Sequence, residues 1–219
     1  MNVIPFRPRA EPEPLAFAIG ARVDLRIGTL ASGVVRPRGT PHEAFAFSNL
    51  ARVLRGARMA WLERGVRATL TLAVPSEVQA ALEADLLNEA ALEAGCTRRS
   101  FNFQLNEREI VAHGPGLPEG LRARGWNVVL RGDDDCPLPF GVRARSLYSE
   151  LVVDAPTEPD PYLALESGDR TPLGRRLLAA KAAGLTVTAE SVNSAAQART
   201  LAIAGFDRGG GSFAEAGLR

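Results

Sequence analysis

Two glutamates stand directly after short apolar segments of the kind that form buried strands. Glu107 follows FNFQLN and Glu190 follows LTVTA. In a (β/α) barrel the chemistry lies at the carboxyl ends of the strands, so each carboxylate could act as a general acid, a general base or a metal ligand. A carboxylate that only braces a loop is an equally open interpretation of both positions.

The acidic cluster of the chain follows another apolar segment, WNVVL. Asp133, Asp134 and Asp135 offer oxygen atoms of the kind that Mg²⁺ and Ca²⁺ bind, but consecutive aspartates point in different directions, so a solvated loop is favoured. Cys136 follows them and could be a nucleophile, although neither histidine stands near it. The sequence has no G-x-S-x-G elbow, so a serine triad is not indicated.

Strand-like and helix-like segments alternate along the chain. The strand-like ones are rich in Val, Leu and Phe and poor in charge, as in strands buried on both faces. The expected strands are 16–25, 67–73, 101–105, 126–130, 150–154 and 185–189. The expected helices are 48–64, 76–94, 118–124, 172–183 and 195–204, with starts at the pairs Ser76 and Gln79, Thr171 and Pro172, and Ser194 and Gln197.

This alternation predicts a parallel sheet covered by helices, and the number of units favours a (β/α) barrel over an open sheet. The Pro-rich and charged stretch 1–14 is expected to be a flexible tail, and 15–219 to be one domain. The glycines at 209–211 follow a short helix instead of opening one, so they are expected to form a flexible turn and not a phosphate loop.

The composition excludes several classes of protein. The 219 residues carry 26 basic and 25 acidic side chains, a net charge of +1 that gives no general attraction to nucleic acid. Two cysteines and two histidines without metal-ligand spacing indicate neither zinc nor a disulfide framework. No apolar run reaches the roughly 18–20 residues of a membrane span, and no secretory signal is present, so a cytoplasmic location is expected.

Nearly all the basic residues are arginine, with Lys181 as the only lysine. Three of them share one face of the expected helix 48–64 with a tryptophan, at three-residue spacing. Such a row could bind a protein partner, although a solvated face that buries the arginine stems is the commoner outcome. The candidate partner-binding residues are Arg52, Arg55, Arg58 and Trp61.

Several segments resemble, in order and spacing, the EAL domain of bacterial cyclic-di-GMP phosphodiesterases. TAESVNSAAQ followed by LAIAGFDRGGG is similar to the family's AEGVET..Q segment and its L...G.d..QGY continuation. FQLNE is similar to LEITE, LRARGWNVVL to the run before the paired aspartates, VVD to KID, and VDLRIG to the hairpin before the EAL tripeptide. The resemblance covers about residues 15–216 and implies an EAL-type (β/α)8 barrel, trimmed at both ends.

The resemblance also implies what the site would contain. In the family, carboxylates and an asparagine bind two divalent metals that activate a water, and a lysine orients it. Here only Glu107 and Glu190 keep the family residue type, and Arg131 stands at a metal-ligand position. We therefore expect no metal, no cofactor and no catalytic residue. The vestigial positions are Val34, Thr71, Gln104, Glu107, Arg131, Gly132, Val152, Glu190, Asn193 and Gly210.

Three hypotheses of function follow. The first is an inactive EAL-like domain that acts as a regulatory or adaptor protein in a bacterial signalling or motility pathway, through a protein partner that the sequence does not identify. The second is a receptor that binds cyclic-di-GMP without hydrolysis, through Arg38, Arg131 and Glu190. The third is an unrelated (β/α) enzyme with a site around Asp133–Cys136 and Glu190. The oligomeric state stays open.

Overall fold

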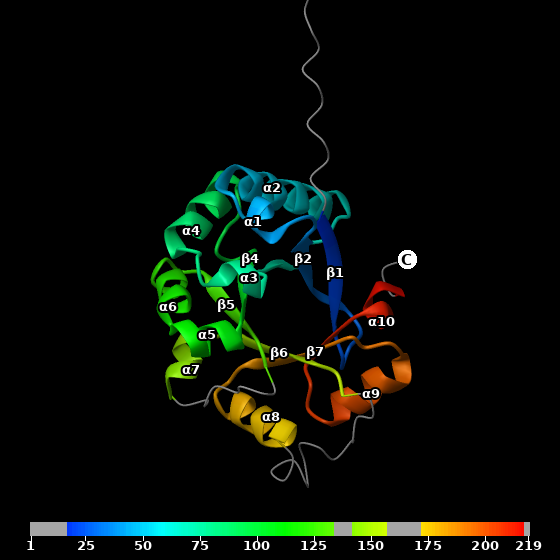
Figure 1. Ribbon diagram of the computed structural model, residues 1–219. Helices are drawn as coiled ribbons and strands as arrows, with labels where there is room; N and C mark the ends of the chain where they lie inside the picture. Colours follow the sequence, from blue (N-terminus) through cyan, green and yellow to red (C-terminus); the bar gives the residue numbers. More distant parts are fainter. Residues whose placement is uncertain (1–16, 134–141, 157–171, 217–219) are drawn as a thin grey trace, which may run out of the picture.

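The computed structural model describes residues 17–133, 142–156 and 172–216. Within these ranges, strands follow one another in chain order around a closed barrel, and helices surround it (Figure 1). The pairs from β2 to β8 are parallel, whereas β1 is antiparallel to both β2 and β8. The strands are β1 (Phe17–Asp24), β2 (Leu30–Pro37), β3 (Thr69–Ala73), β4 (Phe101–Asn106), β5 (Asn127–Arg131), β6 (Glu150–Asp154), β7 (Thr186–Glu190) and β8 (Arg208–Gly210).

The six expected strands are confirmed, and β2 and β8 are additions. The expectation of a flexible turn at the glycine triplet is wrong, because Gly209 and Gly210 belong to β8, which closes the barrel against β1. Gly210 lies beside Glu190, and a Cβ at this glycine would lie 3.2 Å from the glutamate Oε1. Gly210 therefore leaves space for interior side chains, a function that a pattern of apolar residues does not indicate.

The helices cover the outside of the barrel and follow the strand ends. They are α1 (Pro41–Ala44), α2 (Phe47–Glu63), α3 (Ser76–Gln79), α4 (Ala84–Glu93), α5 (Glu107–His113), α6 (Gly116–Ala123), α7 (Val142–Leu147), α8 (Pro172–Ala182), α9 (Ala195–Ile203) and α10 (Ser212–Ala216). None of the described helices is long and apolar enough to cross a membrane.

The single helix expected over 76–94 is wrong, since α3 ends at Gln79 and α4 begins at Ala84. Ser76 is the first residue of α3 and does not cap it, while the Gln79 side chain accepts a bond from the Asn106 backbone N–H instead. The cap at Ser194 is confirmed, because its hydroxyl accepts from the backbone N–H of Gln197. Thr171 lies outside the described residues.

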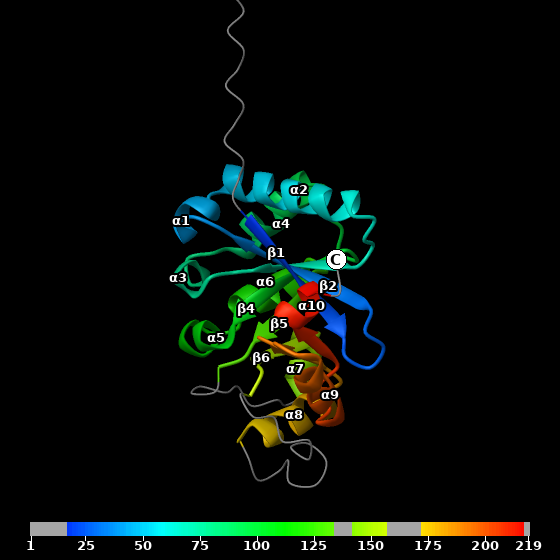
Figure 2. The same ribbon diagram turned by 90° about the vertical axis from the view of Figure 1, so that its right-hand side faces the viewer.

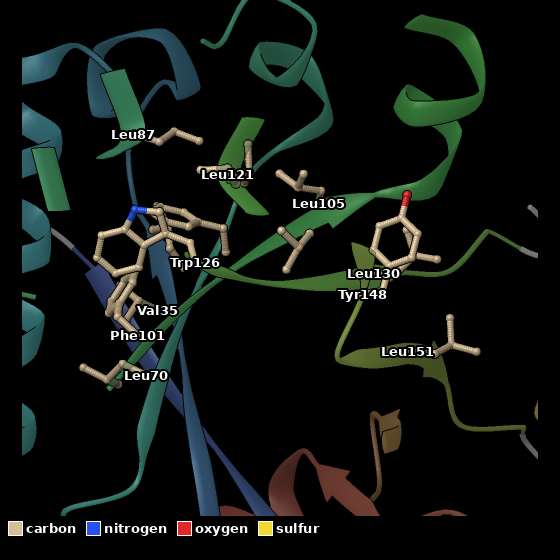
Figure 3. Close-up of a cluster of buried hydrophobic side chains, with 14 of the residues drawn as sticks. Val35, Leu70, Leu87, Phe101, Leu105, Leu121, Trp126, Leu130, Tyr148 and Leu151 are labelled. Carbon is tan, nitrogen blue, oxygen red and sulfur yellow. The ribbon is translucent and has the colours of Figure 1, made fainter. Parts of the chain in front are cut away.

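The main apolar core lies between the barrel and its helices. Figure 3 shows outward side chains of the strands, such as Phe101 and Leu130, among side chains from the helices and connections. Trp126 is completely buried, packs edge-on against Phe103, and donates its indole N–H to Asn88 Oδ1 at 3.0 Å. This outer core leaves the inward positions of the strands free for polar residues.

The two ends of the barrel differ in what surrounds them. We call the end where the parallel strands finish the mouth, and the other end the base. Figure 2 shows the short helices α1, α3 and α5 at the mouth and the turn between β1 and β2 at the base. Because β1 is reversed, its first residue, Phe17, pairs with Pro37 at the mouth. The turn at the base is held by Asp24, whose carboxylate accepts from the N–H groups of Arg26 and Ile27.

Candidate functional site

A completely buried arginine on β1 lies at the centre of the barrel, among oxygen atoms from three other strands. Arg22 donates from Nε to Glu190 Oε1 at 2.7 Å and from Nη2 to Gln104 Oε1 at 2.6 Å. Its Nη1 lies 3.3 Å from Glu150 Oε1. A buried guanidinium is tolerated only when it is paired and hydrogen-bonded, and these three groups meet that condition.

Glu150 extends this interior network toward the base. Its carboxylate accepts from Thr188 Oγ1 at 2.6 Å and from Arg208 Nη1 at 2.9 Å, and it also pairs with Arg22. The network therefore joins β1, β4, β6, β7 and β8. The sequence analysis did not identify Arg22, Glu150, Thr188 and Arg208 as residues of the site. The signal available for the three charged ones was a charged residue at an inward position of an otherwise apolar strand.

At the mouth, a second guanidinium reaches Glu190. Arg36 on β2 donates from Nη2 to Glu190 Oε2 at 2.8 Å, and about half of the arginine side chain is exposed. The side chain passes over β1 at Gly20, where a Cβ would lie 2.8 Å from Arg36 Nη1. Both oxygen atoms of Glu190 are thus engaged by arginines, one buried and one exposed.

Arg131 lies at the carboxyl end of β5, as expected. Its Nη2 pairs with Asp154 Oδ2 on β6 at 2.5 Å, and Asp154 lies opposite Glu190 in the register of β6 and β7. The other terminal nitrogen, Nη1, is buried and has no hydrogen-bond partner among the described residues. Along the mouth, the two carboxylates of Asp154 and Glu190 thus lie between two guanidinium groups, Arg131 and Arg36.

Glu107 is completely buried at the first position of α5. It accepts from the backbone N–H of Asp133 at 2.6 Å and pairs with Arg176 of α8. The guanidinium of Arg176 has room because position 132 is glycine, where a Cβ would lie 2.7 Å from Arg176 Nη2. Glu107 therefore braces the segment that follows β5.

Asp133 is the described member of the acidic cluster, and its carboxylate pairs with Arg108 Nε at 2.7 Å. Asp134, Asp135 and Cys136 lie outside the described residues. Of the separate enzyme site expected around Asp133–Cys136, the structure therefore describes only the carboxylate of Asp133, which is ion-paired.

Most of the remaining vestigial positions line the interior. Val34 and Thr71 are buried and adjacent in the register of β2 and β3, while Val152 lies opposite both Arg131 and Thr188. Asn193 lies in an exposed loop, where its Oδ1 accepts from Ser212 Oγ at 3.2 Å. Among the described interior atoms, Ser32 Oγ, Thr71 Oγ1 and Asn102 Oδ1 lack a hydrogen-bond partner.

Other expected groups are separated by the fold. Arg38 is exposed and lines a groove of about 770 Å³ with Ala18 and Ile19 of β1, outside the group formed by Arg131 and Glu190. On α2, Arg52 and Arg55 are exposed, and Arg55 lies 3.5 Å from Glu93. Arg58 is half-buried. Trp61 is 3% exposed and donates its indole N–H to Ala68 O at 2.8 Å, so its ring belongs to the core side of this helix.

The donor set does not fit a centre of two divalent cations. Such a centre needs several anionic ligands around each ion. In the ranges 17–133, 142–156 and 172–216 no group of three or more His, Cys, Asp or Glu side chains could hold a metal ion. The oxygen atoms of Gln104, Glu150 and Glu190 do converge, but they converge on the guanidinium of Arg22.

Comparison with known proteins gives structural matches alone. No protein-family model matches the chain, and no curated protein matches its sequence. Among solved structures, it is similar to the PaMucR phosphodiesterase in its c-di-GMP complex, with a TM-score of 0.70 and 17% identity over 90% of this chain and 93% of the other. It is also similar to the EAL domain of Mycobacterium smegmatis DcpA, with a TM-score of 0.62 and 20% identity over 92% and 90%.

A third similar structure is Klebsiella pneumoniae BlrP1 in a calcium and cyclic-di-GMP complex, with a TM-score of 0.68 and 18% identity. The match covers 94% of this chain and 57% of BlrP1. At these identities the likeness concerns the fold. The closed barrel with one reversed strand, together with these matches, shows that the chain has the EAL-type (β/α) barrel fold.

Proposed function

We propose that this protein is a regulatory binding protein of cyclic-di-GMP signalling that does not hydrolyse the dinucleotide and acts through a protein partner. The observation that supports the proposal most strongly is the guanidinium of Arg22 among Gln104, Glu150 and Glu190. A positive charge held there opposes the binding of a divalent cation, because like charges at close range in a buried site repel strongly. Arg131 adds a second positive charge at the mouth.

The proposal is tested by incubating the full chain with cyclic-di-GMP and Mg²⁺ or Mn²⁺ and separating the products by chromatography. An active EAL phosphodiesterase serves as the positive control. We expect no linear dinucleotide above the background without protein. Turnover that rises with protein and metal concentration would overturn the proposal.

The regulatory part requires a partner. Affinity purification from native cells, followed by reconstitution of the purified pair, is expected to give a defined complex. A chain that forms no complex with any protein that co-purifies reproducibly would contradict the adaptor role.

A second candidate function is metal-free binding of cyclic-di-GMP at the mouth. It is favoured by one observation: Arg131 Nη1 is buried without a partner among the described residues, at the same end of the barrel as the half-exposed Arg36. Guanidinium groups bind phosphate oxygens strongly through paired N–H groups. Calorimetric titration with cyclic-di-GMP, with and without Mg²⁺, is expected to give the same heat in both cases if this function holds.

The matched variants for that titration are Arg131→Ala and Arg52→Ala. The first removes the unpartnered donor at the mouth, and the second removes an exposed arginine on α2. Absence of heat with the unmodified chain, or equal heat with both variants, would remove the receptor function while leaving the adaptor role in place.

A further inference from the structure

The base of the barrel carries a small cationic hollow, and we propose that it binds an acidic segment of a partner protein that inserts one apolar side chain. The inference rests on the proposed function as a binding protein and names its surface. We call this surface the base hollow. It has a volume of about 210 Å³ and is lined by Arg58, Trp61, Leu62, Val66, Arg67, Ala68, Leu70, Cys96, Thr97, Ser100 and Phe101.

The hollow lies between two connections that lead into parallel strands. One joins α2 to β3 and the other joins α4 to β4, so both are at the end of the barrel opposite Arg36 and Arg131. Helix α2 ends in a turn at Gly65, with a φ of 70°, and α4 ends at Gly95, with a φ of 73°. These positive φ values suit glycine and fix where each connection turns away from its helix.

The floor of the hollow is apolar and rigid. Trp61 is anchored by its bond to Ala68 O and packs on β2 at Gly33, where a Cβ would lie 2.8 Å from the ring. Leu62, at the edge, is 48% exposed. Pockets for drug-sized ligands measure about 300–1,000 Å³, so this smaller hollow suits a single side chain of a partner.

The rim is positively charged. Arg58 and Arg67 line the hollow and Arg64 lies beside it, and none of the three forms an ion pair or a side-chain hydrogen bond with a described residue. Arg64 borders the adjoining groove, which shares Trp61 and Val66 with the hollow. Among the described residues, the lining of the hollow contains Arg58 and Arg67 and no acid. The acids to set against them are Glu63, which is exposed on α2, Glu93, which pairs with Arg55, and Glu215, which lines the adjoining groove. The rim therefore keeps an excess of positive charge.

The chemistry of the hollow favours an acidic peptide over a nucleic acid. Single-stranded nucleic acids bind by stacking bases on exposed aromatic rings, and the rings here are buried, Trp61 at 3% and Phe101 at 1% exposure. The net charge of +1 gives no long-range attraction to a phosphate backbone. An apolar floor inside a cationic rim matches an apolar side chain flanked by glutamate or aspartate.

The test is fluorescence anisotropy of short labelled peptides titrated with the full chain. The probe is an acidic peptide with a central leucine between glutamates. One sister peptide has serine for leucine, another has lysine for glutamate, and an oligo(dT) strand represents nucleic acid. We expect saturable binding of the probe, and weaker binding of the other three ligands.

The double variant Arg64→Glu with Arg67→Glu, at two exposed arginines, is expected to weaken binding of the probe by about tenfold or more, which corresponds to about 1.4 kcal/mol. Leu62→Ser tests the apolar edge and is expected to weaken the leucine probe without changing the serine sister. Arg199→Glu on α9, an exposed arginine elsewhere, reverses one charge and is the control for a charge reversal away from the hollow. Circular dichroism melting curves verify that each variant folds.

Absence of binding, equal binding by the double variant and the control, or preference for the oligonucleotide would each overturn the base hollow as a peptide site. The same preparations are assayed for hydrolysis of cyclic-di-GMP. Hydrolysis would contradict the proposed function itself. A chain that neither hydrolyses cyclic-di-GMP nor binds the peptides would contradict only the peptide site at the base hollow.

Discussion

The arginines inside the barrel and those around the base hollow have the same chemistry and opposite surroundings. Arg22 and Arg208 each have a carboxylate within 3.3 Å. Arg64 and Arg67 at the base have no such partner among the described residues. A count of charges treats both groups alike, but a paired guanidinium contributes to the stability of this chain, whereas an unpaired one is available to another molecule.

The paired and the unpaired arginines are also tested by different measurements. Changes to the paired arginines are expected to lower the free energy of unfolding. Changes to the unpaired ones are expected to leave folding unchanged and to alter binding. The predictions below either remove a group from the paired set or alter the floor beneath the unpaired set.

The largest effect is expected from Arg22→Ala. Removing this guanidinium takes one donor each from Gln104, Glu150 and Glu190, and breaking a buried pair costs about 3–5 kcal/mol of unfolding free energy. Urea denaturation followed by circular dichroism measures the change.

Arg52→Ala, at an exposed position of α2, is the control and is expected to stay within about 0.5 kcal/mol of the unmodified chain. If both variants have the same unfolding free energy, the interior network does not stabilise the barrel.

Gly33→Ala tests the floor of the base hollow. The added Cβ would lie 2.8 Å from the ring of Trp61 and 2.9 Å from Leu70, and the ring is fixed by its hydrogen bond. Overpacking of this kind costs about 1–3 kcal/mol, which the denaturation midpoint reports.

Gly116→Ala is the matched control for that substitution, because a Cβ there meets nothing within 4 Å. A midpoint for Gly33→Ala no lower than that of Gly116→Ala would show that the ring can move, and the hollow could not then be called rigid.

A smaller effect is expected at alkaline pH from Cys96, which also lines the hollow. Burial raises the pKa of its thiol from 9.0 to about 11, against a smaller lowering by Arg58. The unfolded chain therefore releases this proton first, so unfolding becomes more favourable as the pH rises from 9 through 11. Tyr148 acts in the same direction at higher pH, because burial, with Glu107 and Glu119, raises its pKa to about 12.

Urea titrations between about pH 8 and about pH 10.5 are expected to show a shallower loss of stability for Cys96→Ala than for the unmodified chain. Parallel curves for the two proteins would mean that the thiol does not contribute to the alkaline loss.

The smallest effect is expected from Arg36→Ala, which removes the exposed partner of Glu190. Half-exposed ion pairs are screened by solvent and contribute about 0–1 kcal/mol, less at high salt. Comparing the denaturation midpoints of Arg36→Ala and Arg22→Ala measures how far burial, together with the further partners of Arg22, separates two arginines on one carboxylate. Equal losses would contradict the distinction between interior and mouth.

The sequence predicts the architecture better than it predicts the site. Apolar segments identify six strands because their outward side chains pack against helices, and VVL in β5 shows this plainly. The three residues of β8 contain no run of apolar side chains. On the local sequence alone, their glycines predict a turn. The break between α3 and α4 follows from Gln79 bonding to Asn106, a contact 27 residues away that local helix signals do not contain.

Within the site, Glu107, Arg131 and Glu190 could be located because they end strands. Arg22 and Glu150 could not, because a charged residue inside a strand is usually turned to solvent. Only closure of the barrel, which places Gly210 opposite Arg22, makes that position interior. The reason for glycine at 132 and 210 becomes clear only when the side chains beside them are known, the guanidinium of Arg176 at the first and the carboxylate of Glu190 at the second.

The partners of Arg22 also bear on how long the folded state lasts. They lie 82, 128 and 168 residues further along the chain. Contacts between such distant segments form late in folding, when the last strands meet the first. Interactions absent from the folding transition state act mainly on the unfolding rate. We therefore expect weakening of the interior network to speed the unfolding of the closed barrel more than it slows its folding.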